Sequence, residues 1–175
     1  MASVGSPFVS VQTLLSSQPG YVKLVYFDAS AIVKLLIKDG SIKSVADAKD
    51  LFHGSGVVVR TTAICFAETL QVLKRKRFFP SKSDVPLTEL EYINAVAELY
   101  GMMDNTGLMG IDPIQLELDL FNQAEVFVKN HKIDHSDALQ IATLRKCPVD
   151  AYLCTSDNGL ATAASVEKLK VAFLN

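Results

Sequence analysis

The sequence has no tryptophan, and it contains only three histidines and three cysteines among 175 residues. Cys65, Cys147 and Cys154 are odd in number and have neither the spacing of a zinc site nor that of a disulfide framework, so we expect a reducing, cytoplasmic compartment. The histidines are scattered and complete no metal or triad pattern. There is also no nucleophile elbow and no glycine-rich phosphate loop. The sequence therefore predicts none of the common zinc, serine-nucleophile or phosphate-loop sites.

Neither sign of charge is in large excess, because 17 Lys and Arg face 19 Asp and Glu, which gives a formal net charge of −2. Overall charge therefore does not indicate nucleic-acid binding, and any polyanion must meet a local basic patch or bound cations. No apolar run reaches the roughly 18 residues that a membrane span needs. Apolar residues make up 49% of the chain, which is typical of a globular protein.

The first 22 residues carry no charged side chain and are rich in Ser, Gln, Pro and Gly. We interpret residues 1–20 as a flexible leader or arm, and residues 21–175 as a single domain. A chain of this length is large enough for a sizeable core.

Short apolar strands alternate with helices along the rest of the chain, which predicts a three-layer α/β/α sandwich around a mostly parallel sheet. The predicted strands are 21–27, 56–60, 107–113, 151–155 and 170–175. The predicted helices are 29–38, 44–54, 61–77, 87–103, 114–131, 134–146 and 158–165.

Four carboxylates are isolated in sequence that otherwise predicts core. Asp28 is the only charged residue between Lys23 and Lys34, and Glu68 is the only one in TTAICFAETLQVL, residues 61–73. Asp137 and Asp157 are isolated in the same way in HSDALQIATL and AYLCTSDNGLATAAS. Because Asp and Glu are rarely buried without a partner, each of these residues needs an explanation.

Their placement indicates a common site. Asp28 and Asp157 follow predicted strands directly, and ligands of open parallel sheets bind outside the carboxyl ends of the strands. Asp137 falls in the first turn of a predicted helix. Carboxylates that meet there repel one another unless protons or a cation intervene, and a set of oxygen ligands suits Mg²⁺ or Mn²⁺.

An alternative explanation is helix capping, because all three aspartates lie near predicted helix starts, where Asp binds free N–H groups. Asp134 and Asp137 even form a pair that is similar to a capping box. Capping does not explain Glu68, which lies about two turns inside its predicted helix and whose alternative is a solvent-facing edge.

The chain resembles the PIN-domain nucleases, which include the VapC-type toxins, in four motifs that occur in order. They are FDASAIVKL, TTAICFAETL, SDALQIATL and TSDNGL, and the resemblance spans Leu24 to about Asn175. It implies that Asp28, Glu68, Asp137 and Asp157 hold Mg²⁺ or Mn²⁺ in an endoribonuclease that hydrolyses RNA phosphodiester bonds. Ser30 and Thr155 match hydroxyl positions that support such a site, and Asp134 is a second-tier candidate.

The resemblance also implies an RNA substrate and an antitoxin or other protein partner. The apolar residues of 87–103 and 114–128 suit core packing by default, and the alternative is a homodimer or partner surface. Two alternatives stay open. One is a PIN-like module that is catalytically silent and serves in binding or assembly. The other is a haloacid-dehalogenase-type phosphatase, although Ser30 stands where that class needs a second Asp.

The densest basic cluster is KRKR, residues 74–77, with Lys82 close behind. It suits phosphate contacts that lead toward the site. The same residues can instead be cations that favour the carboxyl end of a helix through its dipole.

Overall fold

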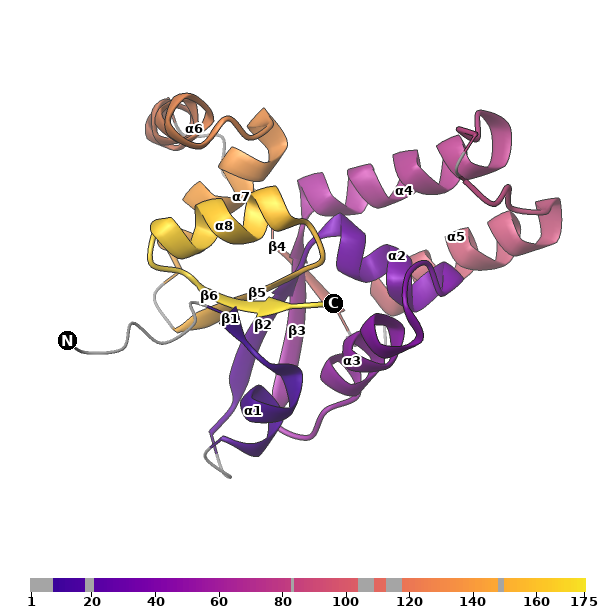
Figure 1. The fold of residues 1–175 in the computed structure, drawn as a ribbon, viewed down its shortest axis with the longest axis horizontal. Helices are drawn as coiled ribbons and strands as arrows, with labels where there is room; N and C mark the ends of the chain where they lie inside the picture. The colour runs from indigo at the N-terminus through magenta and orange to yellow at the C-terminus, as the bar shows by residue number, and fades with distance from the viewer. Residues whose placement is uncertain (1–7, 18–20, 83, 104–108, 113–117, 148–149) are drawn as a thin grey trace.

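The protein is described by a computed structural model that places residues 8–17, 21–82, 84–103, 109–112, 118–147 and 150–175 (Figure 1). Within these residues one sheet is formed, in the order β1-β6-β5-β2-β3-β4, and every neighbouring pair of strands is parallel. The strands are β1 (Phe8–Val9), β2 (Lys23–Phe27), β3 (Val57–Thr62), β4 (Met109–Asp112), β5 (Ala151–Thr155) and β6 (Lys170–Phe173).

Helices cover both faces of the sheet, which makes the three layers that the sequence predicts. One face packs against α1 (Val11–Ser16), α2 (Ala29–Ile37), α3 (Ile42–Phe52), α4 (Ala63–Phe78) and α5 (Glu89–Met103). The other face packs against α6 (Leu118–His131), α7 (His135–Arg145) and α8 (Asn158–Val166). Figure 1 shows α6 and α8 on one side of the strands and α1 and α3 on the opposite side. No helix among the described residues is long and apolar enough to cross a membrane.

The two cores follow from the alternation of side chains along the central strand β2. Val25 and Phe27 belong to the cluster beneath α1–α5, and Tyr26 belongs to the cluster beneath α6–α8. Successive side chains of a strand point to opposite faces, so an apolar run of this kind needs cover on both sides. This explains why residues 24–27 of β2 are all apolar.

The predicted elements between residues 21 and 175 are present, with ends that differ by a few residues. β3 extends two residues further than predicted, through Thr61 and Thr62, and the Thr62 hydroxyl then accepts a hydrogen bond from the backbone N of Cys65 at 3.2 Å as the N-cap of α4. Of the predicted strand 107–113 and helix 114–131, residues 107–108 and 113–117 lie outside the described residues.

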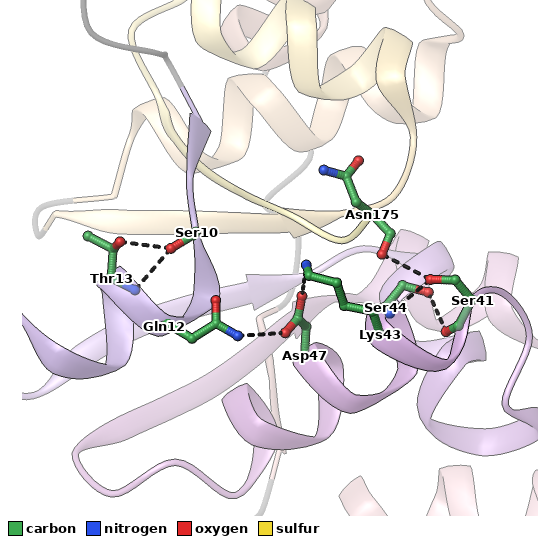
Figure 2. Close-up of polar contacts among 8 residues, drawn as sticks. All are labelled: Ser10, Gln12, Thr13, Ser41, Lys43, Ser44, Asp47 and Asn175. Carbon is green, nitrogen blue, oxygen red and sulfur yellow. Dashed lines mark hydrogen bonds and ion pairs between the residues drawn. The ribbon is translucent and has the colours of Figure 1, made fainter.

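Residues 8–17 pack on the domain. This differs from our interpretation of residues 1–20 as a flexible leader or arm. Phe8 and Val9 add β1 to the sheet beside β6, and α1 buries Val11 and Leu14 in the core. Figure 2 shows Gln12 Nε2 donating to Asp47 of α3 at 3.2 Å, beside the Lys43–Asp47 ion pair. The apolar side chains explain the packing, because a two-residue strand has little stability of its own. Residues 1–7 and 18–20 of that segment lie outside the described residues.

The chain changes faces at the centre of the sheet. After β2 it passes through α2 and α3 on one face to β3, whereas after β5 it passes through α8 on the other face to β6. β2 and β5 are neighbours, so the connections diverge between them. Such a divergence opens a crevice at the carboxyl ends of the two strands.

Candidate active site

Asp28 lies at this crevice because it directly follows β2 and begins α2 as its N-cap. Its Oδ1 accepts a hydrogen bond from the backbone N of Ala31 at 2.8 Å, and its own N–H donates to the carbonyl of Cys154 in β5 at 3.1 Å. The residue is 5% exposed. The junction between strand and helix therefore holds a nearly buried carboxylate at the carboxyl end of the sheet.

Two hydroxyl groups hold the Asp28 carboxylate in place. Thr155 Oγ1 donates to Asp28 Oδ2 at 2.6 Å, and Ser30 Oγ donates to Asp28 Oδ1 at 2.8 Å. Thr155 Oγ1 also accepts from the backbone N of Asp157 at 2.9 Å, so it links the two aspartates. Because both oxygens of Asp28 accept hydrogen bonds, the orientation of its carboxylate is restricted.

Asp157 follows β5 and is exposed at the start of α8. As the N-cap of this helix it accepts a hydrogen bond from the backbone N of Leu160 through Oδ1 at 2.9 Å. Capping therefore occurs at both Asp28 and Asp157. It uses one oxygen of each carboxylate for the helix, so the explanation by capping does not exclude a second role.

Capping does not account for the acids of α7. Asp134 is the N-cap residue of this helix, but its side chain makes no capping hydrogen bond. Asp137 lies in the first turn and is half-buried. Among the described residues neither carboxylate accepts a hydrogen bond or pairs with a cation. Both side chains line a cavity instead.

Glu68 lies in the middle of α4, five residues after the helix begins, and it is half-buried. Its neighbours on the helix, Cys65 and Thr69, are buried. The Glu68 carboxylate makes no hydrogen bond or ion pair within the part of the chain that the structure describes, and it lines the same cavity. Glu68 is therefore not a helix cap, and it pairs with no cation among the described residues.

A single cavity of about 760 Å³ joins these side chains. It is lined by Asp28, Glu68, Asp137 and Asp157, together with Asp134 and Ser30. They come from four different segments of the chain, at the starts of α2, α7 and α8 and in the middle of α4. Thr155 is fully buried and does not line the cavity, but its hydroxyl has hydrogen bonds to Asp28, Asp157 and Ser30, which do.

The crowding of carboxylates changes their protonation. Burial is the main cause that raises the pKa of Asp28 from 3.8 to about 6, against the lowering effect of its hydrogen bonds. Burial also raises the pKa of Asp137 to about 7, and the negative charges of Asp157, Glu68, Asp28 and Asp134 add to this effect. The acids therefore lie close enough to repel one another, and such perturbed groups in a cleft are typical of functional sites.

The side chains share a cavity without forming a tight cluster. Among the described residues, no group of three or more His, Cys, Asp or Glu side chains is arranged closely enough to hold a metal ion. The shared cavity and the mutual effects on pKa place the four acids near one another, and their role as ligands stays a prediction.

The sequence analysis did not single out Ser156 and Gln71, which also line the cavity. Ser156 donates through its backbone N and its hydroxyl to Ser30 Oγ, both at 2.9 Å. Gln71 lies one helical turn after Glu68. Both could have been found by spacing, since Ser156 directly precedes Asp157 and Gln71 follows Glu68 by three residues.

The sequence matches no protein-family model and no curated protein sequence. The structure is similar to that of VapC20 from Mycobacterium tuberculosis, a toxin that cleaves the sarcin-ricin loop, with a TM-score of 0.57 and 19% identity over 79% of this chain and 94% of that chain. It is also similar to FitAcB from Neisseria gonorrhoeae, with a TM-score of 0.53 and 16% identity over 85% of this chain and 96% of that chain.

At these identities the similarity establishes the fold, and the function needs its own argument. The predicted resemblance to PIN domains is confirmed at the level of the fold, as is the predicted three-layer sandwich around a parallel sheet. The chain therefore has the VapC-like fold of PIN-domain proteins.

Proposed function

We propose that this protein is a metal-dependent endoribonuclease that hydrolyses internal phosphodiester bonds of RNA. One observation carries the proposal: four carboxylates that are isolated from other charges in the sequence line one cavity. This cavity lies at the carboxyl ends of β2 and β5 of the PIN-like sheet, where the connections diverge to opposite faces. Three further features support the proposal. Glu68 and Asp137 have no protein partner among the described residues, the pKa of Asp137 is raised, and the fold is shared with a toxin that cleaves RNA.

The donor set fits a hard divalent cation. The described residues that line the cavity include no His or Cys, so the ligands they offer are oxygens, which suit Mg²⁺ or Mn²⁺. Asp28, Glu68, Asp137 and Asp157 would hold the ion, with Asp134 as an additional acid. When bound, such an ion supplies a water of lowered pKa and stabilises charge on the phosphate.

The chain contributes orientation and proton handling. The hydroxyls of Ser30 and Thr155 restrict the Asp28 carboxylate, so this acid presents a fixed geometry to whatever binds in the cavity. Glu68 and Asp137 accept no hydrogen bond from any residue that the structure describes, so either carboxylate can accept a proton from the attacking water. Burial and the neighbouring acids raise the pKa of Asp137 to about 7 in the metal-free protein, and a bound cation would offset this repulsion.

We further propose that the protein is the toxin of a toxin–antitoxin pair, with an antitoxin as its protein partner. The fold that it shares with the toxin VapC20 supports this role. A homodimer stays a prediction from the sequence.

The direct test is cleavage of an internally labelled RNA by the purified protein in Mn²⁺, in Mg²⁺ and in EDTA. We expect internal cleavage with either metal, none in EDTA, and a loss of orders of magnitude in Asp137→Asn. Cleavage that persists in EDTA would contradict the metal-dependent site. If the protein does not cleave RNA with either metal, the silent binding module becomes the better explanation.

A further inference from the structure

The basic run Lys74–Arg77 at the end of α4 has no part in the proposed chemistry, and its residues lie in different environments. Arg75 and Lys76 line the cavity that holds the acids. Lys74 is exposed and is not part of this lining. Arg77 is half-buried and its Nη1 donates to the carbonyl of Leu87 at 3.4 Å. The run is therefore not one uniform patch, and only two of its residues face the cavity.

Lys76 is already neutralised by the protein. Its side chain is nearly buried, and its Nζ lies 3.2 Å from Asp39 Oδ2 and 3.1 Å from Asp84 Oδ1. A lysine held between two carboxylates stabilises the wall of the cavity by joining the segments that follow α2 and α4. It carries no uncompensated positive charge for a ligand.

Arg75 and Lys34 keep their charge available. The Arg75 side chain is exposed, and its guanidinium has no hydrogen bond or ion pair with any residue that the structure describes. Lys34 also lines the cavity, and its Nζ donates to the backbone carbonyl of Asp39 at 3.2 Å, which is a neutral group. A Cβ at Gly40 would overlap Lys34 Nζ, so the glycine leaves room for the amine at this place.

These two cations lie away from the acids of the proposed metal site along the cavity. Glu68 and Arg75 are on the same face of α4, seven residues apart, which corresponds to a rise of about 10 Å. Lys34 lies near the carboxyl end of α2, whereas Asp28 caps its amino end. Among the described residues seven carboxylates and three cations line the cavity, so a polyanion is repelled by most of the lining. All three cations lie at the end away from the proposed metal ligands, where Asp39 and Asp84 are paired with Lys76 and the charges of Arg75 and Lys34 are left to attract it.

We propose that Arg75, together with Lys34, binds a backbone phosphate of the RNA next to the one that is cleaved. This inference rests on the proposed function and names Arg75 as a positioning residue of the same site. The planar fork of a guanidinium suits two phosphate oxygens at once. A phosphate contact of this kind sets the register of the strand across the acids without selecting its sequence.

The test compares Arg75→Gln with the matched control Lys74→Gln, which removes the same charge from the adjacent, outward-facing position. Each variant and the wild type bind a fluorescent single-stranded RNA with Ca²⁺ in place of Mn²⁺, and anisotropy gives Kd at several salt concentrations. Loss of one phosphate contact lowers the slope of log Kd against log salt by about 0.7. The ratio of the Kd of Arg75→Gln to the Kd of wild type should then fall about 2.5-fold between about 50 and 200 mM salt.

Lys74→Gln should keep the wild-type slope, and Arg75→Lys should keep the slope but bind more weakly, because an ammonium is a single point of charge. The inference is overturned if Arg75→Gln has the same slope as wild type, or if the slope decreases equally in both Gln variants. It is also overturned if the wild type does not bind the RNA. Cleavage in Mn²⁺ is measured alongside. If the wild type cleaves RNA but Arg75→Gln keeps the wild-type slope, this inference alone is refuted. If the slope falls in Arg75→Gln but the wild type does not cleave RNA, the proposed nuclease activity is refuted.

Discussion

Replacing Asp28 by Asn distinguishes a functional carboxylate from a structural cap. Asn caps helices about as well as Asp and has nearly the same size, so the change removes the charge and keeps the N-cap of α2 through Oδ1. The amide nitrogen that replaces Oδ2 no longer accepts the hydrogen bond from Thr155 Oγ1. Burial raises the pKa of Asp28 from 3.8 to about 6, so folding shifts this carboxyl toward its neutral form. The shift of about 2 units corresponds to about 3 kcal/mol at neutral pH, since one unit is worth 1.36 kcal/mol.

The sign of this contribution follows from the direction of the shift. Because the folded-state pKa of Asp28 is above the unfolded value of 3.8, the contribution of Asp28 to stability is fully present below about pH 4 and is lost as pH rises through about 6. Without metal, Asp28→Asn should therefore be up to about 3 kcal/mol more stable than wild type at pH 7, and similar to it at pH 4.

The measurement is urea unfolding in EDTA at pH 4 and pH 7, followed by circular dichroism because the chain has no tryptophan. Asp47→Asn is the matched control, since Asp47 is 3% exposed but has Lys43 Nζ at 2.8 Å and Gln12 Nε2 at 3.2 Å. This control should lose up to about 1 kcal/mol at pH 7, because the exposed lysine loses its partner. If Asp28→Asn is instead the less stable protein at pH 7, the Asp28 charge stabilises the fold and our reasoning about the site is wrong.

Three further outcomes are expected. Glu68→Gln should lose RNA cleavage by orders of magnitude while its unfolding free energy in EDTA stays equal to or above that of wild type, and full retention of cleavage would remove Glu68 from the site. Mn²⁺ at about 100 times its Kd should add about 2.7 kcal/mol of stability to wild type, seen as a higher Tm in a melting curve, and an unchanged curve at millimolar Mn²⁺ would argue against a preformed site. Leu14→Ala should cost about 2–5 kcal/mol in urea unfolding because Leu14 is fully buried, and a cost below about 0.5 kcal/mol would mean that α1 does not pack on the domain.

The sequence predicted most elements of this fold, because local patterns in the chain reflect local preferences. The apolar residues of KLVYF require cover on both faces, and the aspartates after two strands mark helix starts that the structure contains. β1 and α1 were missed for a physical reason. A strand of two residues and a helix of six residues are too short for a periodic pattern, and their order depends on burying Val11 and Leu14 against the rest of the domain.

Isolation of the four acids was visible in the sequence, since no neighbouring charge could neutralise them. That isolation marked each of them as a residue in need of a partner, but it did not show which of them share a cavity. Strand order decided this. β2 and β5 lie side by side although their ends are far apart in the chain, so the Thr155 hydroxyl reaches Asp28 at 2.6 Å.

Only the tertiary structure also shows that the residues of the basic run lie in different environments. In the sequence Lys74, Arg75 and Lys76 are equivalent cations at a helix end. In the fold, Asp39 and Asp84 neutralise Lys76, Lys74 is exposed away from the cavity, and Arg75 lines it without a described partner. Residue type and spacing determine which charges a helix carries, whereas the segments that pack around the helix determine which of those charges remain free to bind a ligand.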